Sequence, residues 1–401
     1  MKPADILRSL LLLGGCATFS SLDSGSAQIW TRTSAPGINW RSVACSADGK
    51  KIVAVVQNGG IYTSADSGTT WNLTGAPSQY WTSVASSADG STLVAAAGSS
   101  IYGLNGSIYT STTGGGSWVS NNVSVKDLRG VAISADGQVL QAVAYDVYPA
   151  KGLIWSSINR GLTWARDDVL YSAYLSVASS ADGNKQVVAG ISGTVFISTN
   201  TGSDWRTNSS PASYINAVVC SADGTKLVIL DGLHENIFTS TNSGSAWRSN
   251  YVGYTQDWGS LAGSADGKKL AVVAGGCILT STNSGASWNS NNVPANLWKG
   301  VATSADGNMI VAVATPQSGY GGGIYVSQTT PKPQLTLNVS SHLVLSWMVP
   351  STNFVLQQSS DLTASNWVTL SNTPVLNPTN LQYEVFLPLA GGNRFYRLAT
   401  P

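Results

Sequence analysis

Two short phrases recur along this chain. The first, Ser-x-(Asp/Asn/Thr)-x-Gly-x-x-Trp, occurs six times, at residues 64–71, 111–118, 157–164, 198–205, 240–247 and 281–288. The second, Ser-Ala-Asp-Gly, occurs seven times and begins at Ser46, Ser87, Ser134, Ser180, Ser221, Ser264 and Ser304. Its successive copies begin 40 to 47 residues apart, a spacing typical of repeat architectures, in which each repeat is one supersecondary unit. The chain therefore contains seven repeats, and this number constrains the fold more than any single residue does.

Each repeat has the sequence pattern of β-strands. Residues 81–98 and 106–118, WTSVASSADGSTLVAAAG and GSIYTSTTGGGSW, contain short runs rich in Val, Ala, Ile and Tyr between turn residues. Such runs, bounded by Gly, Asp and Ser, indicate strands rather than helices. Four strands per repeat, which we name A to D, form one blade of a β-propeller. The sequence thus predicts an all-β protein with a seven-bladed propeller.

The seventh repeat lacks its fourth strand. After Tyr325 it reads YVSQTTPKP, without the Gly and Trp of the first phrase. At the other end of the chain, residues 30–40 (WTRTSAPGINW) match residues 71–81 (WNLTGAPSQYW) in length and in their terminal Trp residues. We therefore expect the segment that begins at Trp30 to be the outermost strand of blade seven. This strand would close the ring and remove free sheet edges.

Both phrases have the composition of turns. Asp and Asn side chains accept hydrogen bonds from nearby backbone N–H groups, and Gly adopts positive φ at little cost. The third position of the first phrase is therefore predicted to be structural in Asp66, Asn159, Asn200, Asn242 and Asn283. Thr113 occupies this position in the remaining copy and is expected to make a weaker turn. The Asp of each Ser-Ala-Asp-Gly, such as Asp48, is interpreted as a residue of the A–B hairpin turn.

The first phrase resembles the Asp-box, or BNR repeat, of sialidase-like β-propellers, over about residues 30 to 328. With its short loops the chain is closest in style to non-catalytic members, such as the propellers of photosystem II assembly factors and sortilin-like receptors. This resemblance implies a propeller that binds a protein or a carbohydrate without chemistry.

The same resemblance raises an enzymatic alternative, a glycoside hydrolase of exo-sialidase or xyloglucanase type. Sialidases hold a carboxylate with three arginines and use a Tyr nucleophile, a Glu partner and an acidic acid/base. Here Arg41 and Arg129 share one repeat position with Lys299, and Asp231 and Glu235 lie together in a B–C loop. Xyloglucanases place two acids between two propellers, whereas this chain has one propeller. The two arginines and two acids are catalytic candidates, but the sequence favours a non-catalytic protein.

The candidate ligand site lies opposite the repeated phrases. The A–B and C–D turns share one face of the propeller, which we call the turn face, and the B–C and D–A loops share the loop face. The longer B–C loops of blades two, three and seven bring four tyrosines to the loop face: Tyr102, Tyr145, Tyr148 and Tyr320. The starts of the A strands add four tryptophans: Trp40, Trp81, Trp258 and Trp298. Aromatic rings beside amides suit neutral sugars, whereas the alternative for the tryptophans is that they cap the core.

Composition excludes several functions. Charged residues make up 10% of the chain and the net charge is +1, so no basic surface for nucleic acid is expected. No Cys/His spacing indicates a metal site, and no cofactor is expected. Cys45 and Cys220 occupy equivalent repeat positions and are predicted to be small buried residues. We expect a monomer that binds an extracellular carbohydrate or protein.

The N-terminal segment predicts export to the cell surface or beyond it. Residues 1–27 combine Lys2 and Arg8 with a short apolar run and small residues, the pattern of a bacterial signal peptide. Cleavage after Ala27 would release a secreted protein. The sequence LGGC ending at Cys16 resembles a lipobox instead, which would leave a lipid anchor on that cysteine.

A second domain follows the propeller, which is predicted to span residues 28–330. Residues 331–334 are expected to be a linker. Residues 335–401 alternate apolar and polar positions between loops of Ser, Asn and Pro, which predicts a small β-sandwich. This region resembles the fibronectin-type-III-like modules of exported bacterial proteins, and nothing in it suggests catalysis.

Overall fold

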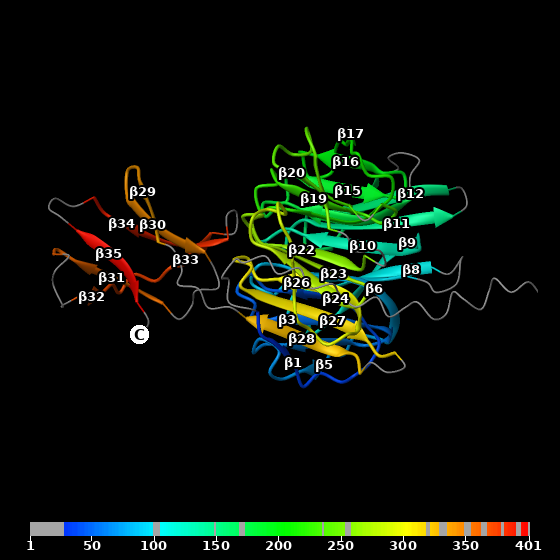
Figure 1. Ribbon diagram of the computed structural model, residues 1–401, viewed down its shortest axis with the longest axis horizontal. Helices are drawn as coiled ribbons and strands as arrows, with labels where there is room; N and C mark the ends of the chain where they lie inside the picture. Colours follow the sequence, from blue (N-terminus) through cyan, green and yellow to red (C-terminus); the bar gives the residue numbers. More distant parts are fainter. Residues whose placement is uncertain are drawn as a thin grey trace, which may run out of the picture.

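The computed structural model describes residues 28–98, 105–147, 150–167, 173–234, 236–252, 258–317, 321–328, 335–348, 354–361, 367–377, 381–389 and 394–399. Every regular element in these ranges is a β-strand, and the strands pair in antiparallel sheets (Figure 1). The predicted all-β fold is therefore confirmed. Within the described residues, no helix has the length and hydropathy needed to cross a membrane.

Seven groups of four strands form the propeller, each in the order A, B, C, D, and the B strand of blade one also pairs with the A strand of blade two, where Gln57 lies opposite Tyr80. Blades one to three are β2 (Trp40–Cys45), β3 (Ile52–Gly59), β4 (Ile61–Ser64), β5 (Asn72–Leu73); β6 (Gln79–Ser86), β7 (Leu93–Ala97), β8 (Asn105–Ser111), β9 (Val119–Lys126); and β10 (Leu128–Ile133), β11 (Leu140–Val147), β12 (Ala150–Ser157), β13 (Ala165–Asp167). Blades four to six are β14 (Tyr174–Ser179), β15 (Gln186–Gly190), β16 (Thr194–Ser198), β17 (Arg206–Ser209); β18 (Ile215–Cys220), β19 (Leu227–Asp231), β20 (Asn236–Ser240), β21 (Arg248–Tyr251); and β22 (Ser260–Gly263), β23 (Leu270–Ala274), β24 (Cys277–Ser281), β25 (Asn289–Ser290). Blade seven is β26 (Leu297–Thr303), β27 (Met309–Thr315), β28 (Gly323–Gln328) and β1 (Trp30–Arg32).

The N-terminal strand closes the ring, as the sequence predicted. Strand β1 pairs antiparallel with β28, and Trp30 lies opposite Ser327. The pairing continues past the strand, because the Thr33 amide donates to the Ile324 carbonyl at 2.9 Å. Blade seven therefore combines β1 with three strands from the end of the repeats. The pairing of β1 with β28 closes the ring.

A second closure runs around the turn face. In each Ser-Ala-Asp-Gly turn, hereafter an SADG turn, the alanine amide donates to the alanine carbonyl of the next blade at 2.7–2.9 Å. The bonds run through Ala47, Ala88, Ala135, Ala181, Ala222, Ala265, Ala305 and back to Ala47. We call these seven residues the alanine rim. They encircle the channel mouth on the turn face and tie each blade to both of its neighbours.

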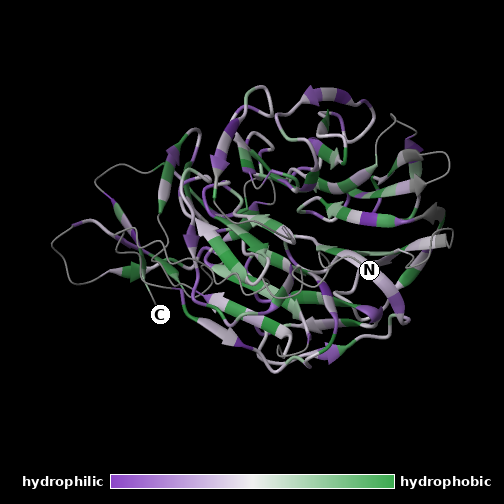
Figure 2. Ribbon diagram, turned by 45° about the vertical axis from the view of Figure 1, so that its right-hand side comes forward, coloured by the Kyte–Doolittle hydropathy of each residue, from purple (hydrophilic) through white to green (hydrophobic). Residues whose placement is uncertain are grey.

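The hydrophobic core lies between blades. The B strands β7, β15, β19 and β23 are buried along their whole length. Each core cluster draws on adjacent blades; Ile52 and Val56 of blade one, for example, pack with Val311 and Val313 of blade seven. Figure 2 shows the hydrophobic residues gathered on the strands, with hydrophilic residues at many of the turns and outer strands. A single blade could not bury its own apolar faces, which is why the ring must be complete.

The six turns of the first phrase, which we call the Asp-box turns after the repeat that they resemble, stabilise the fold through internal hydrogen bonds. The Ser hydroxyl accepts a hydrogen bond from the Gly amide at 2.9–3.0 Å in all six copies. In the first copy, Asp66 Oδ1 accepts from the Thr70 amide and the Ser64 hydroxyl, both at 2.8 Å. Thr113 supplies its hydroxyl oxygen instead, which accepts from the Ser117 amide at 2.8 Å. All of these bonds stay within one turn, so the third-position side chains stabilise the fold.

One feature of these turns was missed by the sequence reasoning. The residue before each Asp-box glycine also has positive φ, including the non-glycine residues Ser67, Arg160, Thr201, Ser243 and Ser284. Such a conformation is disfavoured for residues with a Cβ. The sequence contained a signal for it, because the second copy has glycine, Gly114, at this position.

The C-terminal module consists of two small antiparallel sheets, which is consistent with the predicted sandwich. One sheet has the order β29 (Thr336–Val339), β30 (Leu343–Met348), β34 (Gln382–Leu387), β33 (Val375–Asn377), and the other has β32 (Val368–Thr369), β31 (Val355–Ser359), β35 (Phe395–Ala399). Leu345, Trp347, Leu356, Val385 and Leu387 form its buried core. Figure 1 shows the module beside the propeller, with β33 on the side that faces it.

Candidate functional site

The four tryptophans at the starts of the A strands are core residues. Trp40 and Trp81 are 0% exposed, Trp298 is 3% exposed and Trp258 is 7% exposed. No ring face of these side chains is available to a ligand, which corrects the prediction that they contribute to a binding surface. Their burial favours the alternative that the sequence left open, in which they cap the core.

Aromatic partners within the same blade explain this burial. The Trp40 ring meets Tyr62 edge-on at 5.1 Å, and Trp81 meets Tyr109 in the same way. Two of the four indole N–H groups donate hydrogen bonds: Trp40 to the Pro36 carbonyl and Trp81 to the Gly59 carbonyl, both at 2.9 Å. The aromatic residue on strand C of blades one, two and seven, in phrases such as IYTS, was the sequence signal for an intramolecular ring partner, whereas strand C of blade six, CILTS, has no aromatic residue.

A β-bulge follows the large buried residue near the start of the A strand in six blades: Trp40, Trp81, Leu128, Tyr174, Ile215 and Trp298. In blade one the register shifts between Trp40 and Ser42, so Arg41 is the extra residue. The bulge residues of the six blades are Arg41, Thr82, Arg129, Leu175, Asn216 and Lys299. Bulges redirect a side chain out of the normal alternation and are frequent near functional sites. The bulges therefore place one cation each from blades one, three and seven at the loop-face end of the A strands.

The charge of one of these cations affects the pKa of another. Burial lowers the pKa of the Arg41 guanidinium below its ordinary value; the nearby Tyr80 opposes this shift, and the charge of Arg129 adds to it. Tyr80 is held in place because its hydroxyl accepts a hydrogen bond from the Gln57 amide group. In blade two, between the two arginines, the bulge position holds the small Thr82. The charges of Arg41 and Arg129 are thus close enough to influence one another.

Lys299 belongs to the same group by position. It precedes Gly300, and a Cβ on Gly300 would lie 3.4 Å from the Arg41 carbonyl oxygen and 3.2 Å from the Ser42 Cα. The A strands of blades seven and one are therefore in close contact where the two cations emerge. We call Arg41, Arg129 and Lys299 the cationic cluster.

A carboxylate partly neutralises this cluster. Asp127, which has a positive φ of 50°, forms an ion pair with Arg129. The Asp127 carbonyl also accepts from the Tyr145 amide at 3.1 Å, which links the start of β10 to the end of β11. Tyr145 is half-buried. Of the predicted ligand-binding tyrosines, it is the one that the structure places beside the cluster; Tyr102, Tyr148 and Tyr320 lie outside the described residues.

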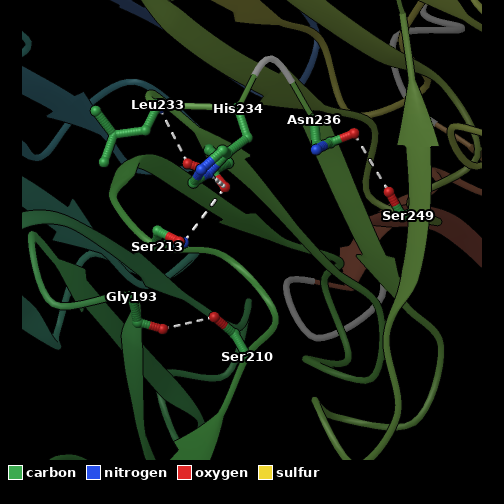
Figure 3. A network of polar contacts seen from close by, with 8 residues as sticks. Gly193, Ser210, Ser213, Leu233, His234, Asn236 and Ser249 are labelled. Atoms are coloured by element: carbon green, nitrogen blue, oxygen red, sulfur yellow. Dashed lines mark hydrogen bonds and ion pairs between the residues drawn. The ribbon is translucent and has the colours of Figure 1, made fainter.

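Asp231 is a structural carboxylate. It is 1% exposed at the end of β19. One oxygen accepts from the Leu233 amide at 3.0 Å, and the other accepts from the Ser213 amide at 3.3 Å and lies 3.1 Å from His234 Nδ1 (Figure 3). These contacts join the B–C turn of blade five to its D–A loop. The hydrogen bonds of Asp231 therefore hold two loops together. Glu235, the second acid predicted in this loop, lies outside the described residues.

The arrangement is suited to binding an anion rather than to acid/base chemistry. Arg41 and Arg129 share one bulge position in blades one and three, whereas Asp231 belongs to blade five and accepts hydrogen bonds from backbone amides. Guanidinium groups bind carboxylates through paired, charge-assisted hydrogen bonds. Within the described residues, no group of three or more His, Cys, Asp or Glu side chains is placed to hold a metal ion.

Comparisons with known proteins support the fold. No protein-family model matches the chain, and no curated protein matches its sequence. Among solved structures, the chain is similar to YCF48 bound to D1 peptide, with a TM-score of 0.55 and 14% identity over 77% of this chain and 97% of that one. It is also similar to the β-propeller domain of Cps50 (Swd1) from Myceliophteria thermophila, with a TM-score of 0.56 and 12% identity over 76% of this chain and 99% of that one. At such identities the likeness shows the shared propeller fold alone.

Proposed function

We propose that this chain is an exported, non-catalytic binding propeller, and that its ligand is an acidic segment of another protein held at the loop-face mouth of the channel. The cationic cluster carries this proposal. Three blades contribute a cation at the same bulge position, and Asp127 pairs with Arg129. Guanidinium groups at this position favour a partner that brings a carboxylate.

The enclosed tryptophans favour a protein ligand over a neutral sugar. Sugar recognition by stacking needs exposed aromatic faces, and Trp40, Trp81 and Trp298 offer none. The similarity to YCF48, which was solved bound to D1 peptide, supports the choice by analogy of fold. The partially desolvated Arg41 is the strongest anchor, because a charged hydrogen bond is stronger where water is scarce.

A peptide array tests the ligand class. The purified protein is applied to peptides that contain Asp, Glu or a free C-terminal carboxylate, and to matched Asn, Gln and C-terminal amide peptides. We expect binding to require the carboxylate, and Arg41→Gln to weaken it about tenfold or more, since a hydrogen bond to a charged group contributes about 1.5–3 kcal/mol. Lys50→Gln is the matched control, because Lys50 is exposed on the turn face.

Other results would change the proposal. Binding to neutral glycans on a glycan array, without binding to any acidic peptide, would replace the protein ligand by a carbohydrate. Equal weakening by Arg41→Gln and Lys50→Gln would remove the cationic cluster from the site.

The hydrolase alternative has a separate test. We expect the purified protein to release no fluorophore from a sialoside and no reducing sugar from xyloglucan, because Asp231 is occupied by backbone donors. Turnover that Arg41→Gln or Glu235→Gln abolishes would establish an enzyme instead.

Export is proposed from residues 1–27, and release after Ala27 is favoured over anchoring. The mass of the mature protein recovered from a bacterial host decides between them. A chain that begins at Gln28 is expected in the secreted fraction, whereas a lipidated chain that begins at Cys16 in the membrane fraction would show the anchored form.

A further inference from the structure

The C-terminal module contacts the propeller at the alanine rim. Leu381, just before β34, lines a cavity of about 170 Å³ together with Ala47, Ala88, Ala305 and other rim residues. Ala47 and Ala305 are buried there and share a hydrophobic cluster with Leu376, Leu381 and Tyr383 of the module. These three residues of the module therefore lie over the mouth of the channel on the turn face.

The shape of the rim suits an apolar side chain. All seven rim positions are alanine, which presents one methyl group and leaves the mouth open. The rim amides and carbonyls already bond to one another, so the polar groups left in the cavity are side-chain hydroxyls, such as those of Ser86, Ser179 and Thr303. The rim methyl groups give Leu381 an apolar contact beside these hydroxyls.

Leu381 itself has an unfavourable backbone conformation. Its φ is 55°, a region that bulky residues other than glycine rarely adopt. A hydrogen bond from its amide to the Asn377 carbonyl, at 2.9 Å, holds the turn. A leucine thus occupies a position whose backbone conformation suits glycine better, and such strain is found at positions where the side chain has a role.

Tyr383 provides a second contact with the propeller. Burial raises the pKa of its phenol, and the carboxylate of Asp48 in the SADG turn of blade one raises it further. Tyr383 is also packed against Trp347 in the core of the module, with the ring centroids 6.1 Å apart. The contact at the rim is thus connected to the rigid interior of the module.

Two cysteine thiols lie in the same cavity. Cys45 of blade one and Cys220 of blade five line it beneath the rim, at equivalent repeat positions. Burial raises the pKa of each thiol to about 12. They are native reporters of access to this end of the channel, because alkylation requires the reagent to reach the sulfur and the thiol to ionise.

We propose that Leu381, packed with Leu376 and Tyr383 against the alanine rim, is a plug that closes the turn-face end of the channel. The plug makes the channel a blind pocket entered from the loop face. It also makes the C-terminal module a lid whose position determines whether the thiol-lined end is open. This inference does not depend on the identity of the ligand at the cationic cluster.

Peptide-resolved alkylation by N-ethylmaleimide of the native, full-length protein tests the plug. We expect slow alkylation of Cys45 and Cys220 in the unchanged protein, and alkylation at least about tenfold faster in Leu381→Gly. Glycine suits the positive φ, so this variant removes the side chain while it preserves the turn. Leu337→Gly is the control for a leucine-to-glycine change in the module, because Leu337 is 50% exposed on β29.

Cys277 is the internal control for unfolding. It is 5% exposed in blade six and packs in a different core cluster, so its alkylation rate should be the same in every variant. Equal rates at Cys45 and Cys220 in the unchanged protein and in Leu381→Gly would overturn the plug. Small-angle scattering gives an independent reading, since release of the lid should increase the radius of gyration in Leu381→Gly, and an unchanged radius would show that Leu381 does not hold the module.

Discussion

Closure of the ring by β1 leads to a quantitative prediction. Trp30 is the first residue of β1; it is half-buried and packs against the cluster formed by Ala312, Trp298 and Tyr325. Full burial of an aromatic side chain makes its replacement by alanine cost about 3–5 kcal/mol. Because Trp30 is only half-buried, we expect Trp30→Ala to lower the free energy of unfolding by about 2 kcal/mol.

The neighbouring residue supplies the control. Ile29 is 79% exposed, so Ile29→Ala should change the free energy of unfolding by less than about 0.5 kcal/mol. At roughly 2–4 °C per kcal/mol for a domain of this size, Trp30→Ala should melt about 4–8 °C lower than the unchanged protein. Deletion of residues 28–34 should lower it further, because it also removes the pairing of β1 with β28.

Differential scanning calorimetry on the full chain measures these shifts. The propeller transition must be followed separately from any transition of the C-terminal module, since the two units need not unfold together. If Trp30→Ala and Ile29→Ala melted at the same temperature, or if the deletion left the propeller transition unchanged, the reasoning that β1 completes blade seven energetically would be refuted.

Two further predictions concern the Asp-box turns. Asn283→Ala removes an acceptor for the Ser287 amide and the Ser281 hydroxyl, both at 2.9 Å. We expect it to lower the free energy of unfolding in urea by about 1 kcal/mol. Asn292→Ala, at an exposed position, is the control and should have no measurable effect. The hydrogen bonds to Asp66, the one from the Thr70 hydroxyl first, lower the pKa of its carboxyl from 3.8 to about 2. The stability from this shift is present above pH 3.8 and lost as the pH falls toward 2. Asp66→Asn, which copies the residue found in four other blades, should therefore make the melting temperature depend less on pH in this range. An unchanged pH dependence would assign the loss of stability in acid to other groups.

The repeat pattern was sufficient to predict the propeller and its closure. Each SADG and Asp-box turn uses its own side chains for its hydrogen bonds, as in Ser46 to Asp48 at 2.5 Å and Ser64 to Asp66 at 2.8 Å. Local sequence therefore determines local structure in these turns. The match between residues 30–40 and 71–81 predicted that the N-terminal strand completes a blade. That strand, β1, pairs with β28 as expected.

The candidate site was less predictable because of the A-strand bulges. Side chains alternate between the two faces of a strand, and one inserted residue reverses the assignment of every position beyond it. The sequence did not show where the register shifts, at Arg41 in blade one. The burial of Trp40, which was expected at a ligand surface, has another cause: its edge-on contact with Tyr62 and its hydrogen bond to the Pro36 carbonyl. The sequence showed that Arg41, Arg129 and Lys299 share one repeat position. It did not show that each of them is the extra residue of a β-bulge, which redirects the side chain.

The contact between the C-terminal module and the rim could not be predicted at all. It depends on the hairpin end at Leu381, and neither periodicity nor composition distinguishes that leucine from others in the module. Long-range contacts between a repeat domain and a non-repeating one leave no pattern in a single sequence.

The ring of hydrogen bonds through the alanine rim bears on how such a chain can evolve. In an open solenoid, duplication or loss of one repeat lengthens or shortens the array and leaves the remaining interfaces intact. Here every rim amide is matched with the carbonyl of the next blade, and the last bond, from Ala305 to Ala47, returns to the first. A six- or eight-bladed descendant would have to change the angle at every junction at once. Duplication of one blade should therefore prevent the chain from folding. A circular permutation with its new ends in another D–A loop would leave every junction between blades unchanged.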